Sequence, residues 1–130
     1  MTMRERAIKD NCEKGRASES FAVAHLKHEG YRVVACNQRT PLGELDIICS
    51  LEGCFVVVEV KARSSSTYGE PLEAIGPRKE KRLRGAAAWW LAERGLFPCA
   101  VRFDAVAVTL DGVGRPRRLE HVKDVMGGGG

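Results

Sequence analysis

The fold is decided by residues 43–63, which read GELDIICSLEGCFVVVEVKAR. Two apolar runs, 43–50 and 54–62, flank a short polar turn, and this pattern is typical of a β-hairpin. The run Phe55–Val58 is apolar at every position, so the second strand is expected to lie centrally in a sheet covered on both faces. Charged side chains nevertheless interrupt both strands: Glu44 and Asp46 on the first, Glu59 and Lys61 on the second.

Turn length sets the register of this hairpin. With residues 51–54 as a four-residue turn, counting outward predicts three opposed pairs: Ser50 with Phe55, Asp46 with Glu59, and Glu44 with Lys61. Side chains alternate between the faces of a strand, so two sets are expected to point in opposite directions. These sets are Leu45, Ile47 and Cys49 on one face, and Glu44, Asp46 and Ile48 on the other.

The expected pair of Asp46 and Glu59 points to metal chemistry. Directly opposed side chains have Cβ atoms about 5 Å apart, and like charges there destabilise a sheet. A divalent cation would remove the repulsion, and oxygen ligands without His or Cys favour Mg²⁺ or Mn²⁺. Such an ion activates a bound water for phosphodiester hydrolysis, and Lys61 is placed to orient that water. The alternative is a salt-bridged face in which Glu44 pairs with Lys61 and no ion binds.

A helix is expected on each side of the hairpin in the sequence. Residues 15–28 place three apolar side chains on one stripe: Ala22, Val23 and Leu26. Glu19 lies on the same stripe, and an acid in a first turn also favours the helix dipole, so a structural and a metal-binding role both stay open. Residues 77–93 form the clearest helix, with an apolar stripe of Leu83, Ala86, Ala87, Trp90 and Leu91.

Cations crowd the start of the second helix, at Arg78, Lys79, Lys81, Arg82 and Arg84. Cations at a helix N-terminus oppose its dipole, so they make more sense if they meet phosphate. Lys79 lies on the apolar stripe and is expected to lean over the sheet, with Arg82 beside it. A solvated basic face is the alternative for the cluster, and the preferred interpretation of Lys81 and Arg84. The net charge of the chain is only +4, so the distribution says more than the total.

The remaining segments complete an α/β pattern in one domain. Strands are expected at 31–37 and 100–110, with a crossover that makes the second parallel to its neighbour in the sheet, and a weak edge element runs on to residue 126. Loops are expected at 38–42 and 63–77, the latter with one helical turn at 72–75. Residues 1–14 form an extension, 15–126 the domain and 127–130 a disordered glycine tail.

Several classes of protein are disfavoured by composition. No run of 18 apolar residues and no apolar signal core is present, which favours a cytoplasmic protein without membrane insertion. Five cysteines without paired spacing favour reduced thiols over a disulfide framework or a zinc site. The three histidines (25, 28 and 121) lack ligand spacing and are interpreted as surface or packing residues. Arg102 and Asp104 share a strand face and are expected to pair with each other.

An ordered series of short motifs resembles the YraN family of small bacterial proteins. The motifs are GxxSExxA at 15–22, GY at 30–31, NxR at 37–39, GELDII at 43–48, VEVKAR at 58–63, YG at 68–69, KxxRLxxxA at 79–87 and RFD at 102–104. That family resembles the restriction-endonuclease-like PD-(D/E)xK superfamily and archaeal Holliday-junction resolvases. The departures are slight: Ser18 stands where Gly is usual and Leu45 replaces the common Ile.

The resemblance implies a restriction-endonuclease-like mixed central β-sheet flanked by helices. It places Asp46, Glu59 and Lys61 on catalytic strand positions and Glu19 on the helical acid that joins the metal site. The implied activity is Mg²⁺- or Mn²⁺-dependent cleavage of DNA, on branched or junction DNA in processing or recombination, by a homodimer. The side chains then expected to hold phosphates are Lys79, Arg82, Arg39 and Arg63.

Two other functions are compatible with the sequence. A non-catalytic nucleic-acid-binding module would keep the fold and its basic helix and would bind DNA without the acidic residues. A protein-interaction subunit would bind no nucleic acid at all. The intact set of two acids and a lysine favours the enzyme.

Overall fold

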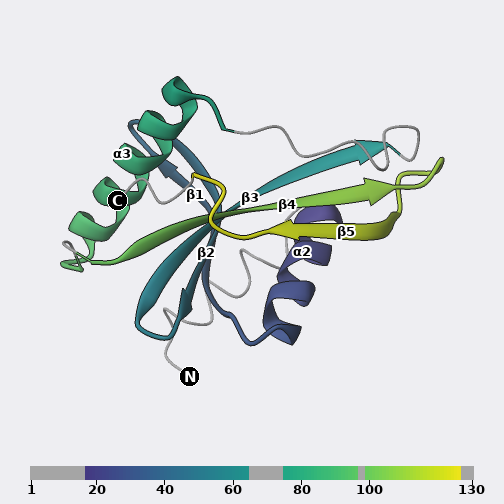
Figure 1. Cartoon of the computed structure of the whole chain (residues 1–130), viewed down its shortest axis with the longest axis horizontal. Coiled ribbons are helices and arrows are strands. Elements are labelled where there is room, and N and C mark those ends of the chain that lie inside the picture. Colours follow the sequence, from purple (N-terminus) through teal and green to yellow (C-terminus); the bar gives the residue numbers. More distant parts are fainter. Residues whose placement is uncertain (1–16, 65–74, 97–98, 127–130) are drawn as a thin grey trace.

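The computed structural model describes residues 17–64, 75–96 and 99–126. Two helices and five strands make up this part of the chain, and the strands form one sheet (Figure 1). In chain order they are α2 (Ala17–His28), β1 (Arg32–Thr40), β2 (Gly43–Leu51), β3 (Cys54–Ser64), α3 (Pro77–Glu93), β4 (Val101–Leu110) and β5 (Pro116–Val122).

The sheet is mixed, with the spatial order β1-β2-β3-β4-β5. Strands β1, β2 and β3 pair antiparallel, β3 and β4 pair parallel, and β4 and β5 pair antiparallel. The parallel pair follows from the crossover through α3, because a strand that returns through a helix enters the sheet in its original direction. The predicted α/β class, with a mixed central sheet flanked by helices, is therefore confirmed.

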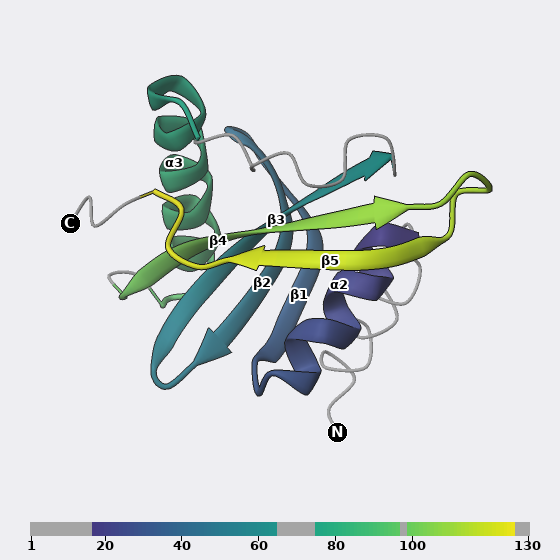
Figure 2. The ribbon, with the colours of Figure 1, turned by 45° about the vertical axis from the view of Figure 1, so that its right-hand side comes forward.

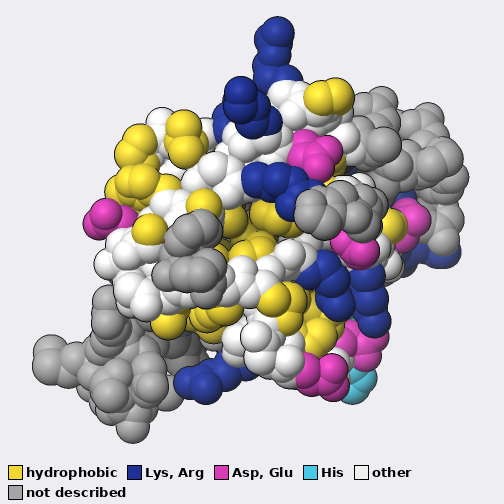
Figure 3. All heavy atoms as spheres, turned by 60° about the vertical axis from the view of Figure 1, so that its left-hand side comes forward, with side chains coloured by type: hydrophobic (Ala, Val, Ile, Leu, Met, Phe, Trp, Pro, Cys, Tyr) yellow, Lys and Arg dark blue, Asp and Glu magenta, His cyan; other side chains and the backbone are white. Residues whose placement is uncertain are grey.

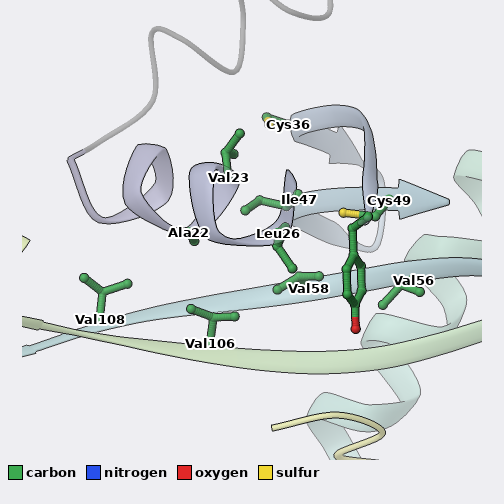
Figure 4. Close-up of a cluster of buried hydrophobic side chains, with 11 residues drawn as sticks. Ala22, Val23, Leu26, Cys36, Ile47, Cys49, Val56, Val58, Val106 and Val108 are labelled. Atoms are coloured by element: carbon green, nitrogen blue, oxygen red, sulfur yellow. The ribbon is translucent and has the colours of Figure 1, made fainter. Parts of the chain in front are cut away.

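A hydrophobic core fills each face of the sheet, because the two helices lie on opposite sides of it (Figure 2). The stripe predicted for α2 is confirmed: its side chains lie against the strands (Figure 4). This first core contains Ala22, Val23, Leu26, Tyr31, Cys36, Ile47, Cys49, Val56, Val58, Val106 and Val108. The strand β3 contributes to both cores, as its continuous apolar run predicts.

The second core lies under α3, whose predicted bounds and stripe are confirmed. It contains Ala35, Leu45, Ile48, Val57, Leu83, Ala86, Ala87, Trp90, Leu91, Phe103 and Met126. The indole N–H of Trp90 donates to Gln38 Oε1 at 3.0 Å, and the Arg94 guanidinium lies 4.0 Å from the centre of its ring. Trp90 therefore belongs to the core, with its one polar atom satisfied at the border.

The register predicted for the β2–β3 hairpin holds from the turn to Ile47↔Val58 and then ends. The pairs predicted beyond that point, Asp46 with Glu59 and Glu44 with Lys61, are wrong as backbone pairs, although both strands are described throughout. Strand β2 keeps its pairing with β1 on the other side, through Gln38↔Leu45 to Thr40↔Gly43. The two strands β2 and β3 therefore separate at Asp46.

Strict alternation along β2 also fails at Asp46. Leu45 packs in the core under α3, whereas Ile47, two residues later, packs in the core under α2. In the β1–β2 register, the residue facing Asp46 is Asn37, whose φ of 52° is left-handed, and this position is missing from the ladder. A left-handed residue reverses the facing of its strand locally, and the neighbouring strand follows. The predicted grouping of Leu45 with Ile47 is wrong for this reason.

Smaller differences concern the ends of elements and the cysteines. Strand β1 continues to Thr40, through part of the segment predicted as a loop, and the weak edge element is the regular strand β5.

The thiols of Cys49, Cys54 and Cys99 are free, as expected, whereas Cys36 is disulfide-bonded, which corrects the expectation there. The predictions for residues 1–14, 72–74 and 127–130 lie outside the described residues. Within the described ranges, no helix has the length and apolar character needed to cross a membrane.

Candidate active site

Asp46 is fixed at the point where β2 and β3 separate. Its Oδ2 accepts a hydrogen bond of 2.9 Å from the backbone N–H of Val60. Val60 stands between Glu59 and Lys61 in the sequence. The Asp46 side chain thus satisfies a donor of β3 that lies beyond the backbone ladder, and it holds its carboxylate against the Glu59–Lys61 segment.

The environment of Asp46 disfavours its charge. The pKa of Asp46 is raised from 3.8 to about 6, mainly by burial and also by the nearby carboxylates of Glu59, Glu19 and Glu44, against the lowering effect of the Val60 N–H. Glu44 lies on the same strand as Asp46, Glu59 on the neighbouring strand β3 and Glu19 in the first turn of α2, so carboxylates of three elements act on Asp46. This convergence includes all three acids predicted for a metal site.

Glu59 is engaged by a cation of α3. Its Oε2 lies 2.9 Å from Nζ of Lys79, and the two side chains are 20% and 48% exposed. Lys79 therefore leans over the sheet, as its position on the apolar stripe predicts. In the structure the ammonium group of Lys79 neutralises the Glu59 carboxylate, as a bound cation would otherwise do.

The other predicted residues lie around this end of the sheet in different settings. Lys61 is exposed two residues beyond Glu59, and Arg39 is exposed in backbone register with Glu44. The stem of Arg82 passes the first residue of β2, since a Cβ added to Gly43 would lie 3.5 Å from its Cγ and Cδ atoms.

Arg63 is held by the sheet rather than presented to solvent. It forms an ion pair with Glu120 of β5 at 3.0 Å, and its side chain is only 10% exposed. Its guanidinium is therefore less available to a phosphate than those of Arg39 and Arg82, both of which belong to exposed residues.

Basic side chains also mark the exterior of α3. Arg78, Lys79, Lys81 and Arg82 are exposed in its first two turns. Figure 3, which brings this side of the molecule forward, shows Lys and Arg side chains together with hydrophobic side chains on the face. The basic surface and the carboxylates meet at the ion pair of Lys79 with Glu59.

The donor chemistry of the site fits Mg²⁺ or Mn²⁺, whereas its present conformation is not closed around an ion. Among the described residues, no three His, Cys, Asp or Glu side chains are grouped so that they could hold a metal. A hard cation prefers oxygen donors such as these carboxylates. It would also stabilise the charged form of Asp46, whose pKa is raised without it. A bound ion would compete with Lys79 for the Glu59 carboxylate. The residues that would hold the ion are Asp46, Glu59 and Glu19.

A buried polar network around Asp104 lies apart from these carboxylates and was not foreseen as a whole. The Asp104 side chain is 0% exposed and accepts hydrogen bonds from Arg102 (2.8 and 2.9 Å), Tyr31 (3.2 Å) and the backbone N–H of Asp124 (3.0 Å). The pairing of Arg102 with Asp104 is confirmed.

Two histidines extend this network, so their interpretation as ordinary surface or packing residues is wrong. His121 Nε2 lies 2.9 Å from Asp104 Oδ2, and His121 Nδ1 lies 3.1 Å from His25 Nε2. Burial opposes ionisation of Asp104, but the hydrogen bonds from His121, Arg102 and the Asp124 backbone together hold its pKa well below the usual range. The available signal was two charged residues, Arg102 and Asp104, inside the apolar run of residues 100–110.

The comparisons with known proteins agree on one family. The family described as "Uncharacterised protein family UPF0102" matches residues 18–108, which include every predicted site residue. A UPF0102 protein of Moorella thermoacetica is 44% identical over 110 residues, covering 85% of this chain and 92% of the relative. UPF0102 proteins of Renibacterium salmoninarum (41%; 89% and 98% covered) and Thermus thermophilus (43%; 84% and 93% covered) are similarly close. The family-level expectation from the YraN motifs is met, and the chain belongs to the UPF0102 family.

Proposed function

We propose that this protein is a Mg²⁺- or Mn²⁺-dependent endonuclease that hydrolyses DNA phosphodiesters, with the restriction-endonuclease-like superfamily as its structural class. One observation carries the proposal: the Asp46 carboxylate is hydrogen-bonded at 2.9 Å to the residue between Glu59 and Lys61. An acid of one strand is thereby held against an acid–x–lysine segment of the next, at the point where the strands open. Branched and junction DNA are the substrate class implied by the resemblance.

Six of the predicted site residues have a role in this proposal. A bound Mg²⁺ or Mn²⁺ would make a water ligand more acidic and polarise a phosphoryl oxygen. Asp46, already fixed by Val60, and Glu59 would present their oxygens from adjacent strands, and Glu19 would add one from α2. Lys61, exposed beside them, would orient the attacking water and stabilise charge on the phosphate. Lys79 and Arg82 would hold flanking phosphates once Glu59 has turned away.

Replacing Glu59 by Gln tests the proposal directly. We expect the wild type to cleave linear, flapped or four-way DNA in the presence of Mn²⁺, and the variant to lose at least about 100-fold in rate, because a neutral amide binds a hard cation poorly. Gel assays with and without EDTA measure this. Glu52→Gln, an exposed acid in the β2–β3 turn, serves as the matched control and should leave the rate unchanged. Cleavage that persists in Glu59→Gln would refute the site assignment.

A non-catalytic DNA-binding module is the second candidate, favoured by the ion pair of Lys79 with Glu59 and by the lack of a closed metal group among the described residues. Such a module would bind DNA in EDTA equally well with Asp46→Asn and Glu59→Gln, and wild type would cleave nothing with Mn²⁺. The homodimer expected from the resemblance stays a prediction under either function.

Removing Lys79 separates its two roles. Because Lys79 competes with a cation for Glu59, Lys79→Ala is expected to raise the affinity for Mn²⁺ about two- to fivefold, the value of a partly exposed ion pair. The same change should weaken DNA binding, and the slope of log K against log salt should become flatter by about 0.9, since one phosphate contact is lost. Titration calorimetry and fluorescence anisotropy measure the two effects. Lys81→Ala, on the same helix, is the control for the first; an unchanged Mn²⁺ affinity in Lys79→Ala would count against competition at Glu59.

A further inference from the structure

The hairpin formed by β4 and β5 extends past the end of the sheet. Its strands pair up to Leu110↔Pro116, and residues 111–115 connect them. The neighbouring strand β3 ends at Ser64, in register with Leu110, so the connection lies beyond the last paired residue of that strand. Figures 1 and 2 both show this turn projecting from the body of the molecule.

The turn is held rigidly by its own backbone and by Asp111. The Asp111 N–H donates to the Arg115 carbonyl (2.8 Å), and the Gly114 N–H donates to the Asp111 carbonyl (3.0 Å). Asp111 Oδ1 accepts from the N–H groups of Val113 (3.0 Å) and Arg115 (2.9 Å). Gly114 has a left-handed φ of 83°, which allows the tight return. These bonds fix the backbone positions from which the outer side chains of the turn project.

The outer side chains of the turn are exposed to solvent. Val113 at the apex is 76% exposed, the highest value among the exposed large hydrophobic residues described. Arg115 and Arg117 follow within four positions, and both residues are exposed. Adjacent cations on a short hairpin repel each other, which costs stability unless a polyanion lies against them.

The acids near these arginines offset only part of their charge. Backbone hydrogen bonds of the turn lower the pKa of Asp111, and the positive charge of Arg117 lowers it further. Asp111 is committed to the two backbone N–H groups of the turn, and Glu120 is paired with Arg63 at 3.0 Å. Residues 111–123 carry four Lys or Arg side chains and two acids. Residues 111–123, which we call the arm, therefore present a net positive charge with one apolar side chain at the tip.

The arm and the carboxylates lie along one direction of the sheet. Strands β3 and β4 are parallel neighbours, with Glu59 in register with Ala105 and Arg63 with Thr109. At about 3.3 Å per residue, the end of β4 lies roughly 17 Å beyond Glu59, and the tip a little farther. At about 3.4 Å per base pair, this distance corresponds to roughly half a turn of duplex DNA.

We propose that the β4–β5 hairpin is a second DNA contact, in which Arg115 and Arg117 bind backbone phosphates about half a helical turn from the phosphate at Glu59 and Lys61, and Val113 packs on the sugars of the groove between them. The inference rests on the proposed function, since it takes DNA as the ligand of the acidic site. It assigns the arm to positioning the duplex, because phosphate contacts fix register without reading sequence.

Salt-dependent binding tests the arm separately from cleavage. In EDTA, where no cleavage occurs, fluorescence anisotropy with linear duplex and four-way DNA gives the slope of log K against log salt. For Arg115→Ala/Arg117→Ala we expect a slope flatter by about 1.8 and an affinity about tenfold lower, because two phosphate contacts are lost. Arg115→Lys/Arg117→Lys keeps both charges and should keep the wild-type slope. Val113→Ser should lower the affinity about threefold without changing the slope, since it removes apolar area and no charge.

The control removes two exposed cations at the opposite end of the sheet. Arg32 pairs in register with Ser50, near the β2–β3 turn, and Lys27 lies at the end of α2. Lys27→Ala/Arg32→Ala should keep the wild-type slope. If wild type binds and cleaves DNA but the arm variant keeps the slope, the hairpin contact is overturned and the nuclease stands. If DNA binding depends on the arm but Mn²⁺ supports no cleavage, the contact of the arm with DNA is supported and the nuclease proposal is refuted. If wild type binds no DNA, both proposals are refuted.

Discussion

Asp46→Asn is expected to abolish metal-dependent cleavage while making the metal-free protein more stable. The rate should fall by at least about 100-fold, since loss of even an outer partner of a metal ligand costs about 10- to 100-fold. The asparagine can still accept the Val60 N–H through its amide oxygen, so the hydrogen bond that closes the hairpin is kept. The variant therefore removes charge and little else.

The gain in stability follows from the raised pKa of Asp46. A rise from 3.8 to about 6 means that the folded protein binds the Asp46 proton more tightly than the unfolded chain does. Ionisation then costs folding free energy, beginning above about pH 4 and complete above about pH 6, with an upper value of roughly 3 kcal/mol. In EDTA, the free energy of unfolding of Asp46→Asn should thus exceed that of wild type by about 1–3 kcal/mol at pH 8, and the two values should match near pH 4.

Urea unfolding at the two pH values, followed by circular dichroism, measures this difference. Saturating Mn²⁺ should stabilise wild type at pH 8 and leave Asp46→Asn unchanged, because only the wild type binds the ion in the folded state. Glu52→Gln should behave as wild type in every condition, since the residue lies in an exposed turn. An Asp46→Asn variant that is less stable than wild type at pH 8 would contradict the electrostatic description of the site.

Asp104→Asn is expected to lower the free energy of unfolding by about 3–5 kcal/mol. The substitution keeps the size of the side chain but removes the charge that Arg102 and His121 face, and it places an NH₂ group among donors. The Arg102 guanidinium, whose side chain is 29% exposed, loses the anion that it pairs with, and this loss carries most of the cost. Urea unfolding at pH 7 measures it.

The pH dependence of this effect has the opposite sign from that of Asp46. Because the pKa of Asp104 is lowered in the folded protein, its ionisation stabilises the fold above the unfolded value of about 4, and this contribution is lost as the pH falls below that value. The difference in the free energy of unfolding between wild type and Asp104→Asn should therefore become smaller in acid. Asp111→Asn should change stability only slightly, because the asparagine side-chain oxygen can still accept the two N–H groups of this exposed turn. A loss at Asp104 of that small size would show that the network is not structurally important.

Most of the fold follows from local patterns in the sequence. The bounds of α3 are set by Pro77 and by its apolar period, and the first pairs of the β2–β3 ladder are set by the length of the turn. The end of that ladder could not be predicted, because it depends on a neighbour. The left-handed Asn37 on β1 faces Asp46 across strands and reverses the facing of β2 at Leu45. Counting along one strand contains no information on the backbone of the next.

The candidate site was predictable in its residue types and only partly in its contacts. Acids among apolar strand residues draw attention to Asp46 and Glu59 because they violate the pattern around them. That Lys79 would lean toward the sheet follows from its helical stripe, but its choice of Glu59 as partner depends on the distance between α3 and β3. The histidines of the Asp104 network lie 96 positions apart, so no local spacing could reveal that they touch.

The irregular strand β1 has a consequence for how copies of this chain can associate. It lies at one edge of the sheet, where unpaired backbone groups invite another strand to add. A register shift between Val33 and Ala35 and the left-handed Asn37 bend that edge out of a straight line. The opposite edge, β5, begins at Pro116, which has no N–H to offer. Both borders thus resist edge-to-edge aggregation, and a symmetric pair of subunits would meet through helices or loops instead of one continuous sheet.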